Sequence, residues 1–122
     1  MKLRLRGNSL RLRLNQNDVG ELASGRKLIE TLTFPGGANF QYTLVMGDSS
    51  LDVSAQLVAS TIAVTLPAER ARRWAAGDDV GIYFELPAGD SVLKVAVEKD
   101  LECLDAPLDE RDPFAYPRET AC

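Results

Sequence analysis

Leucine and basic side chains alternate along the first fourteen residues, and no other part of the chain is as regular. A period of two puts the leucines on one face and the basic residues on the other, as in half-buried strands. Between the two runs, Gly7-Asn8 can supply the positive φ angles of a two-residue hairpin turn. The register that this turn predicts pairs Leu5 with Leu10, Leu3 with Leu12, Arg4 with Arg11 and Lys2 with Arg13.

Further short apolar segments are separated by turn-forming Gly, Pro, Asn and Asp. We expect strands over residues 27–33, 40–46, 51–59, 61–66, 80–86 and 92–97. Asn15 or Asn17 can cap a short helix that Gly25 ends. Pro67 can open a second helix, whose alanine stripe includes Trp74 and predicts that this side chain is buried. No internal repeat is evident among the residues.

These segments predict an α+β, mostly β fold. We expect a small antiparallel barrel or sandwich of about seven strands, with one or two short helices and an irregular C-terminal tail. The 122 residues suit a single domain over 1–122, with a β-rich body over 1–100 and an acidic irregular tail over 101–122. Aromatic side chains at strand and helix spacing are expected in the core: Tyr42, Trp74, Tyr83, Phe84 and Tyr116.

Charge is unevenly spread along the chain. Residues 1–26 carry six cations and two anions, whereas residues 98–122 carry eight anions and three cations. The strand face with Lys2, Arg4, Arg6, Arg11 and Arg13 is a candidate anion-binding site, because arginine grips phosphate and carboxylate bidentately. Alternatively, the tail carboxylates neutralise this face, since like charges directly opposed destabilise a sheet. The candidate partners in that case are Asp105, Asp109, Glu110 and Asp112.

The chain contains no histidine, which removes the commonest general base and the usual zinc ligand. No catalytic, cofactor or metal motif is recognisable, so we expect no catalytic residue, cofactor or metal. The leading hypothesis is a small binding or protein-interaction module, for which an anionic ligand on the Arg-rich strand face is a candidate. The alternative is a small enzyme without histidine that uses carboxylates or a metal bound by oxygen.

The partners of the chain are not specified by its sequence. A homo-oligomer or a protein partner is compatible with it, whereas nucleic acid is disfavoured by the net charge of −4 and by leucines where stacking aromatics would be needed. No segment suits a membrane span, and no continuous apolar block follows the basic start, so we expect a cytoplasmic location. Cys103 and Cys122 are then expected to be free thiols.

Three runs of residues resemble a family of short uncharacterised bacterial proteins. They are Gly7-Asn8-Ser9-Leu10-Arg11-Leu12-Arg13-Leu14, Trp74 followed by Val80-Gly81-Ile82, and Glu98-Lys99-Asp100 with Cys103-Leu104. The resemblance spans most of the chain, and the family is a domain of unknown function. It therefore implies no activity, ligand or catalytic residue. The family's acidic tail with Phe-Pro and a late cysteine is only approximated here by residues 112–117 and Cys122.

Overall fold

The computed structural model describes residues 1–48, 53–101 and 112–117. These residues form β1 (Lys2–Arg6), β2 (Ser9–Leu14), α1 (Gln16–Ala23), β3 (Leu28–Thr33), β4 (Asn39–Met46), β5 (Ser54–Val58), β6 (Thr61–Leu66), α2 (Ala68–Ala76), β7 (Gly81–Ala88) and β8 (Ser91–Lys99). The predicted mostly β, α+β class is confirmed, and eight strands replace the expected seven or so.

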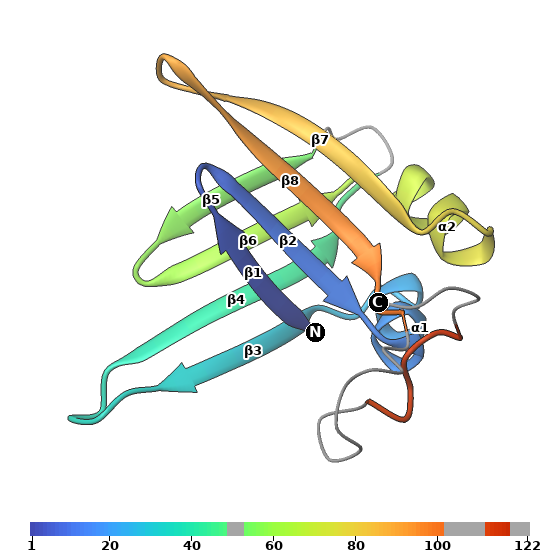
Figure 1. Cartoon of the computed structure of the whole chain (residues 1–122), viewed down its shortest axis with the longest axis horizontal. Coiled ribbons are helices and arrows are strands. Elements are labelled where there is room, and N and C mark those ends of the chain that lie inside the picture. The colour runs from blue at the N-terminus through green and yellow to red at the C-terminus, as the bar shows by residue number, and fades with distance from the viewer. Residues whose placement is uncertain (49–52, 102–111, 118–122) are drawn as a thin grey trace.

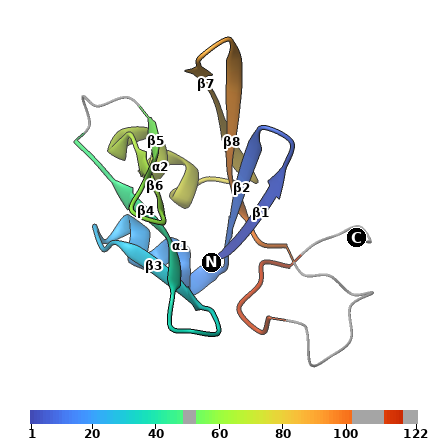
Figure 2. The same ribbon diagram turned by 90° about the vertical axis from the view of Figure 1, so that its left-hand side faces the viewer.

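The strands form two four-stranded sheets that face each other as a sandwich and do not close into a barrel. Sheet A has the order β1-β2-β8-β7, and sheet B has the order β3-β4-β6-β5. Figure 1 shows the four hairpin turns on one side of the molecule and both helices on the other. In Figure 2, seen from the side of the turns, the two sheets are separate layers.

Each sheet joins two antiparallel hairpins through a parallel pair at its centre. Strands β2 and β8 run parallel in sheet A, and β4 and β6 run parallel in sheet B. The expectation of a purely antiparallel sheet missed these pairs. Glycine-containing turns reveal three of the hairpins locally, whereas the turn between β5 and β6 is Ala59-Ser60, both with positive φ. Because α1 and α2 carry the chain from one sheet to the other, strands far apart in sequence become neighbours.

The order of elements repeats, although no repeat is evident among the residues. A hairpin, a helix and a second hairpin follow one another as β1-β2-α1-β3-β4 and again as β5-β6-α2-β7-β8. Each half gives its first hairpin to one sheet and its second hairpin to the other. The buried positions repeat as well: Leu12 with Val64, Leu14 with Leu66, Val19 with Ala71, and Leu22 with Trp74.

The predicted register of the first hairpin is confirmed. Leu5 lies opposite Leu10 and Arg4 lies opposite Arg11, and Gly7 in the turn has a φ of 54°. Glycine adopts such a positive φ without steric cost. The leucines of β2 consequently face the space between the sheets, where Leu12 and Leu14 are fully buried.

The two helices close the end of the sandwich opposite the turns. Asn15 caps α1, since its side chain accepts a hydrogen bond from the backbone N–H of Asp18 while Asp18 accepts one from the backbone of Asn15. Trp74 of α2 is 2% exposed, which confirms its predicted burial, and its Nε1 donates to the carbonyl oxygen of Val80 at 3.0 Å. The expectation that Tyr83 is a core residue is wrong, because its side chain is 57% exposed.

Candidate functional site

The outward face of sheet A gathers six cations in a regular grid. The leucines of β1 and β2 point inward, so the alternate basic residues point outward. Strand register orders the outward side chains in three rows across the sheet. The rows are Arg6-Ser9-Lys94-Glu85, Arg4-Arg11-Ala96-Tyr83 and Lys2-Arg13-Glu98-Gly81. We call this set of residues the basic face.

Glu98 links three residues of the basic face. Its Oε1 lies 3.2 Å from Nε of Arg11 and 3.7 Å from Nε of Arg13. Its Oε2 accepts a hydrogen bond of 2.7 Å from the hydroxyl of Tyr83. This hydrogen bond to Glu98 is the main reason that the pKa of Tyr83 is raised above 10.0, so the phenol keeps its proton at neutral pH.

Gly81, two residues before Tyr83 on the same strand, leaves room for the phenol end of the Tyr83 side chain. A Cβ added at Gly81 would stand 2.7 Å from Oη and 2.9 Å from Cζ of Tyr83, and 2.8 Å from Cγ of Glu98. Any side chain at this position would therefore displace the ring or the carboxylate. The phenol end of the ring therefore lies over Gly81, while much of the Tyr83 side chain is exposed to solvent.

A hollow of about 390 Å³ opens on the basic face. Small side chains, Ser9 and Ala96, occupy the middle of two rows, and long side chains surround them. The charged and aromatic residues that line the hollow are Arg4, Arg6, Arg11, Lys94, Glu85, Tyr83 and Phe84. Its volume falls within the range of about 300–1,000 Å³ that is usual for small-molecule sites.

Half of the cations on the basic face have a carboxylate close by. Nζ of Lys2 lies 2.8 Å from Oδ2 of Asp100, and Glu98 forms ion pairs with Arg11 and Arg13. The ion pairs found among residues 1–48, 53–101 and 112–117 include none with Arg4, Arg6 or Lys94. The three cations that form no ion pair with a described residue all line the hollow.

The outward face of sheet B provides an internal comparison, because the repeated fold gives it equivalent positions. Its matching rows are Val58-Thr61-Gln41-Thr31, Gln56-Ala63-Thr43-Ile29 and Ser54-Thr65-Val45. None of these eleven side chains is charged, and the position that matches Gly81 falls on Lys27, the residue before β3. Arg4 corresponds to Gln56, and Arg11 corresponds to Ala63. The same architecture thus carries a charged face on one side and an uncharged face on the other.

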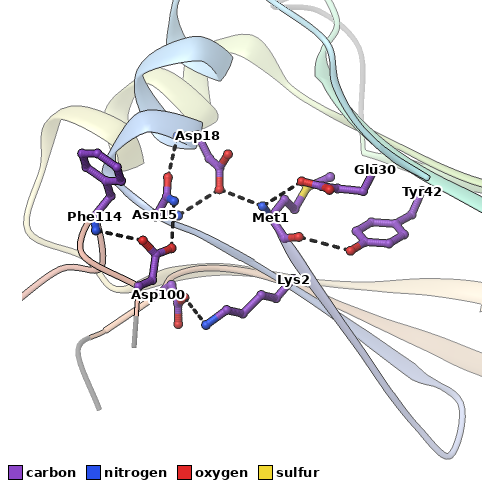
Figure 3. A network of polar contacts seen from close by, with 9 residues as sticks. Met1, Lys2, Asn15, Asp18, Glu30, Tyr42, Asp100 and Phe114 are labelled. Atoms are coloured by element: carbon purple, nitrogen blue, oxygen red, sulfur yellow. Dashed lines mark hydrogen bonds and ion pairs between the residues drawn. The ribbon is translucent and has the colours of Figure 1, made fainter. Parts of the chain in front are cut away.

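A second polar network joins the start of β1 to α1 and to sheet B (Figure 3). The amino group of Met1 lies 2.9 Å from Asp18 and 3.1 Å from Glu30. The hydroxyl of Tyr42 donates to the carbonyl oxygen of Met1 at 3.1 Å, and burial raises the pKa of Tyr42 above 10.0. These contacts fix the end of β1 at which the basic face begins.

Residues 112–117 lie against the N-terminal end of α1 and the end of β8. The side chain of Asp112 accepts a hydrogen bond of 2.8 Å from Nδ2 of Asn15 and another of 2.8 Å from the backbone N–H of Phe114. The bond from Asn15 is the main cause of the lowered pKa of Asp112. The backbone of Tyr116 donates to the carbonyl oxygen of Asp100 at 2.7 Å. Asp112 therefore serves to hold this segment in place.

Glu98, Lys99 and Asp100 are consecutive, yet their side chains serve three different parts of the molecule. Glu98 belongs to the basic face, and Asp100 binds Lys2. Lys99 is buried, and its Nζ donates a hydrogen bond of 2.7 Å to the carbonyl oxygen of Gly77 at the end of α2. A cation is favourable there, because carbonyl groups at a helix C-terminus carry partial negative charge. The Lys99 ammonium also lies near the rings of Trp74 and Tyr116.

All five predicted anion-site residues, Lys2, Arg4, Arg6, Arg11 and Arg13, lie on the basic face. The prediction did not include Lys94, Tyr83, Glu85 or Glu98, which β7 and β8 bring to the same face. Of the predicted tail carboxylates, Asp112 binds Asn15, while Asp105, Asp109 and Glu110 lie outside the described residues, as do Cys103 and Cys122. The available signal was the alternation of apolar and other residues along β8. It places Lys94 and Glu98 on one face of the strand and the buried Val95 and Val97 on the other.

Within the described ranges, no three His, Cys, Asp or Glu side chains gather as metal ligands would. Neither α1 nor α2 is long and apolar enough to cross a membrane, and these are the helices of the part that the structure describes.

A sequence model with the description "Family of unknown function (DUF7009)" matches residues 1–119. The chain belongs to this family. The match confirms the resemblance to a domain of unknown function and spans every strand and helix of the DUF7009 fold described above. No curated protein and no solved structure matches the chain. The residues of this DUF7009 member are therefore the available guide to its function.

Proposed function

We propose that the basic face of sheet A binds an anionic ligand and that the protein is a small binding module. The contrast between the two outward faces carries this proposal. Twelve outward positions in three rows of sheet A include six cations and two anions. Eleven of the matching positions lie within the strands of sheet B and hold only uncharged side chains, and the twelfth, which matches Gly81, falls on Lys27 just before β3, so the fold itself does not require the six cations.

The close spacing of the cations is costly unless something binds them. Arg4 lies directly opposite Arg11, and like charges at such positions destabilise a sheet. Selection for stability alone would favour uncharged residues, as in sheet B. An anion that meets two arginines offsets this repulsion, and the planar guanidinium groups suit phosphate or carboxylate.

Glu98 holds the Arg11 side chain in place for such a ligand and leaves part of its guanidinium group free to bind. The contact uses Nε of Arg11, which is one edge of the guanidinium group. The opposite edge, formed by the two Nη groups, stays available for a bidentate contact. Holding the side chain in place before binding reduces the entropy that is lost when the ligand arrives.

Neutralisation by the chain's own tail is the competing explanation. Glu98 and Asp100 already neutralise part of the face, and Asp112 is engaged by Asn15. The pairing of Asp105, Asp109 and Glu110 with arginines stays a prediction. It is tested with a variant that carries Asp105→Asn, Asp109→Asn and Glu110→Gln. We expect this variant to bind phosphate as the native protein does, and a gain of tenfold or more would mean that the tail competes for the face.

The direct test is calorimetric titration with inorganic phosphate at low salt. Arg4→Gln combined with Arg6→Gln should weaken binding by about tenfold or more, as expected when charge-assisted contacts of about 1.5–3 kcal/mol are lost. The matched control is Gln56→Ala combined with Val58→Ala, which alters the equivalent positions of sheet B and should leave the affinity unchanged. Absence of phosphate binding by the native protein, or equal loss in both variants, would contradict the proposal.

The enzyme hypothesis, the cytoplasmic location, the bacterial origin and the single-domain organisation stay predictions from the sequence. The basic face supports a binding module more directly than an enzyme, because the described contacts of Glu98 hold Arg11, Arg13 and Tyr83 in place beside cations that can bind an anion.

A further inference from the structure

The hollow on the basic face is polarised along the rows of the sheet. The β1 and β2 side contributes three arginines, Arg4, Arg6 and Arg11, whereas the β7 side contributes Tyr83 and Glu85. Lys94 of β8 lies between the two sides, next to Glu85. Glu98 lies one row further on the β8 side. A ligand that fills the hollow therefore meets cations at one end, and a phenol ring and carboxylates at the other.

This polarity disfavours a uniform polyanion. A nucleic acid strand or a polyphosphate chain laid across the sheet would place negative charge next to Glu85 and Glu98. Like charges at such a distance repel, which lowers the affinity for such a chain. The suitable ligand is anionic at one end only, with an uncharged portion at the other end.

Tyr83 indicates what the uncharged portion contains. Its hydroxyl is held by the 2.7 Å hydrogen bond to Glu98, and the phenol end of the ring lies over Gly81. The side chain is exposed and lines the hollow. An exposed aromatic ring that is held in place is a platform on which a planar ring can stack.

The size of the hollow agrees with a ligand larger than a single oxyanion. Its volume of about 390 Å³ leaves space beyond a phosphate group seated between the arginines. The remaining space extends over Ala96 toward Tyr83, because these two residues are neighbours in one row. A phosphate at Arg4 and Arg11 and a ring at Tyr83 would thus occupy the two ends of the same row.

We propose that the ligand is a phosphate monoester of a compound with a planar ring, of about the size of a mononucleotide. The phosphate contacts Arg4, Arg6 and Arg11, and the ring stacks on Tyr83. Polar hydrogens on the ring or its sugar can donate to Glu85, which lies at the same end of the hollow. This inference rests on the proposed function, since it names the ligand class of the same face.

The test compares three probes by calorimetry: inorganic phosphate, adenosine monophosphate and adenosine. The native protein should bind adenosine monophosphate about tenfold more tightly than inorganic phosphate, and adenosine weakly. Tyr83→Ala should reduce the affinity for adenosine monophosphate to that for phosphate. Tyr83→Phe keeps the ring and should retain most of the difference, which separates stacking from the hydrogen bond to Glu98.

The two proposals fail in different ways. If inorganic phosphate binds but adenosine monophosphate binds no more tightly, the ligand class is wrong and the anion site stands. The same conclusion follows if Tyr83→Ala weakens both probes equally while its circular dichroism spectrum and melting temperature remain native. If neither probe binds, the anion-binding function itself is overturned, and the ligand class falls with it.

Discussion

Nε of Arg11 lies 3.2 Å from Oε1 of Glu98, although 87 positions separate the two residues in the sequence. The contact exists because β2 and β8 pair in parallel and place Glu98 next to Arg13, one step from Arg11 along the same face. The carboxylate of Glu98 contacts the phenol of Tyr83 as well as two arginines. This one group therefore affects both the charge and the geometry of the basic face.

Glu98→Gln removes this charge while keeping the shape of the side chain. We expect the affinity for inorganic phosphate to rise roughly fivefold, because a nearby carboxylate that opposes the anion is worth about 1 kcal/mol near the surface. The melting temperature in the absence of phosphate should fall at low salt, where the arginines repel most strongly. Glu69→Gln, on the exposed side of α2, is the control and should leave both quantities unchanged. The glutamine oxygen can still accept from Nε of Arg11, so this arginine stays in place and the lost charge is the larger effect. Reduced phosphate affinity in Glu98→Gln would contradict this expectation and would mean that the charge of Glu98 holds Arg11 for the ligand more than it opposes the anion.

Gly81→Ala should separate Tyr83 from Glu98. The new Cβ would stand 2.7 Å from Oη of Tyr83, so the ring has to move and the hydrogen bond to Glu98 is lost. Since that bond is the main cause of the raised pKa of Tyr83, the pKa should return toward 10.0. Phenolate absorbance during a pH titration measures this change. Gly20→Ala in α1 meets no atom within 4 Å and is the control, expected to leave the titration unchanged.

Asp112→Asn tests how residues 112–117 are held. The pKa of Asp112 lies below 3.8, chiefly because Asn15 donates a hydrogen bond to its carboxylate. A lowered native pKa means that the stabilisation is fully present above pH 3.8 and is lost as the pH falls through the lower native value. The melting temperature of the variant should therefore lie below that of the native protein at neutral pH, and the gap should close in acid. Asp48→Asn, at an exposed position, should show no such gap at either pH.

Trp74→Ala should lower the free energy of unfolding by about 3–5 kcal/mol, the usual cost of deleting a large core aromatic side chain. Leu22→Ala, at the equivalent position of α1, should cost about 2–5 kcal/mol. Urea denaturation measures both. Trp74→Phe keeps a ring but loses the hydrogen bond to Val80, and it should fall between Trp74→Ala and the native protein. If Trp74→Ala lowered the free energy of unfolding by less than about 1 kcal/mol, the face of α2 that carries Trp74 and the alanines would not be part of the core.

The hairpins and the helix ends follow from local chemistry, which explains why the sequence predicts them. Gly7 supplies the positive φ of the first turn, and Asn15 caps α1 with its own side chain. The predicted strand over residues 61–66 coincides with β6. The final turn is tighter than expected, because β7 continues through Pro87 to Ala88 and leaves only Gly89 and Asp90 between the strands.

The parallel pairs and the full composition of the basic face depend on tertiary structure, which local patterns do not encode. Lys94 and Glu98 reach the face only because β8 pairs with β2. Tyr83 has the spacing of a core aromatic residue, yet it lies on the outward side of β7. The repeat is hidden for a similar reason. Equivalent positions such as Leu22 and Trp74 share burial but not residue type, and Asn15 corresponds to Pro67 at the start of α2.

The exchange of hairpins between the two halves has a consequence for how such a protein can change over generations. Each sheet needs one hairpin from each half, so a chain of half this length could build the sandwich only as a pair of identical copies. Every substitution would then appear twice, once on each outer surface. Joining the halves in one chain removes this restriction. One surface is then free to accumulate arginine while its counterpart keeps threonine and glutamine.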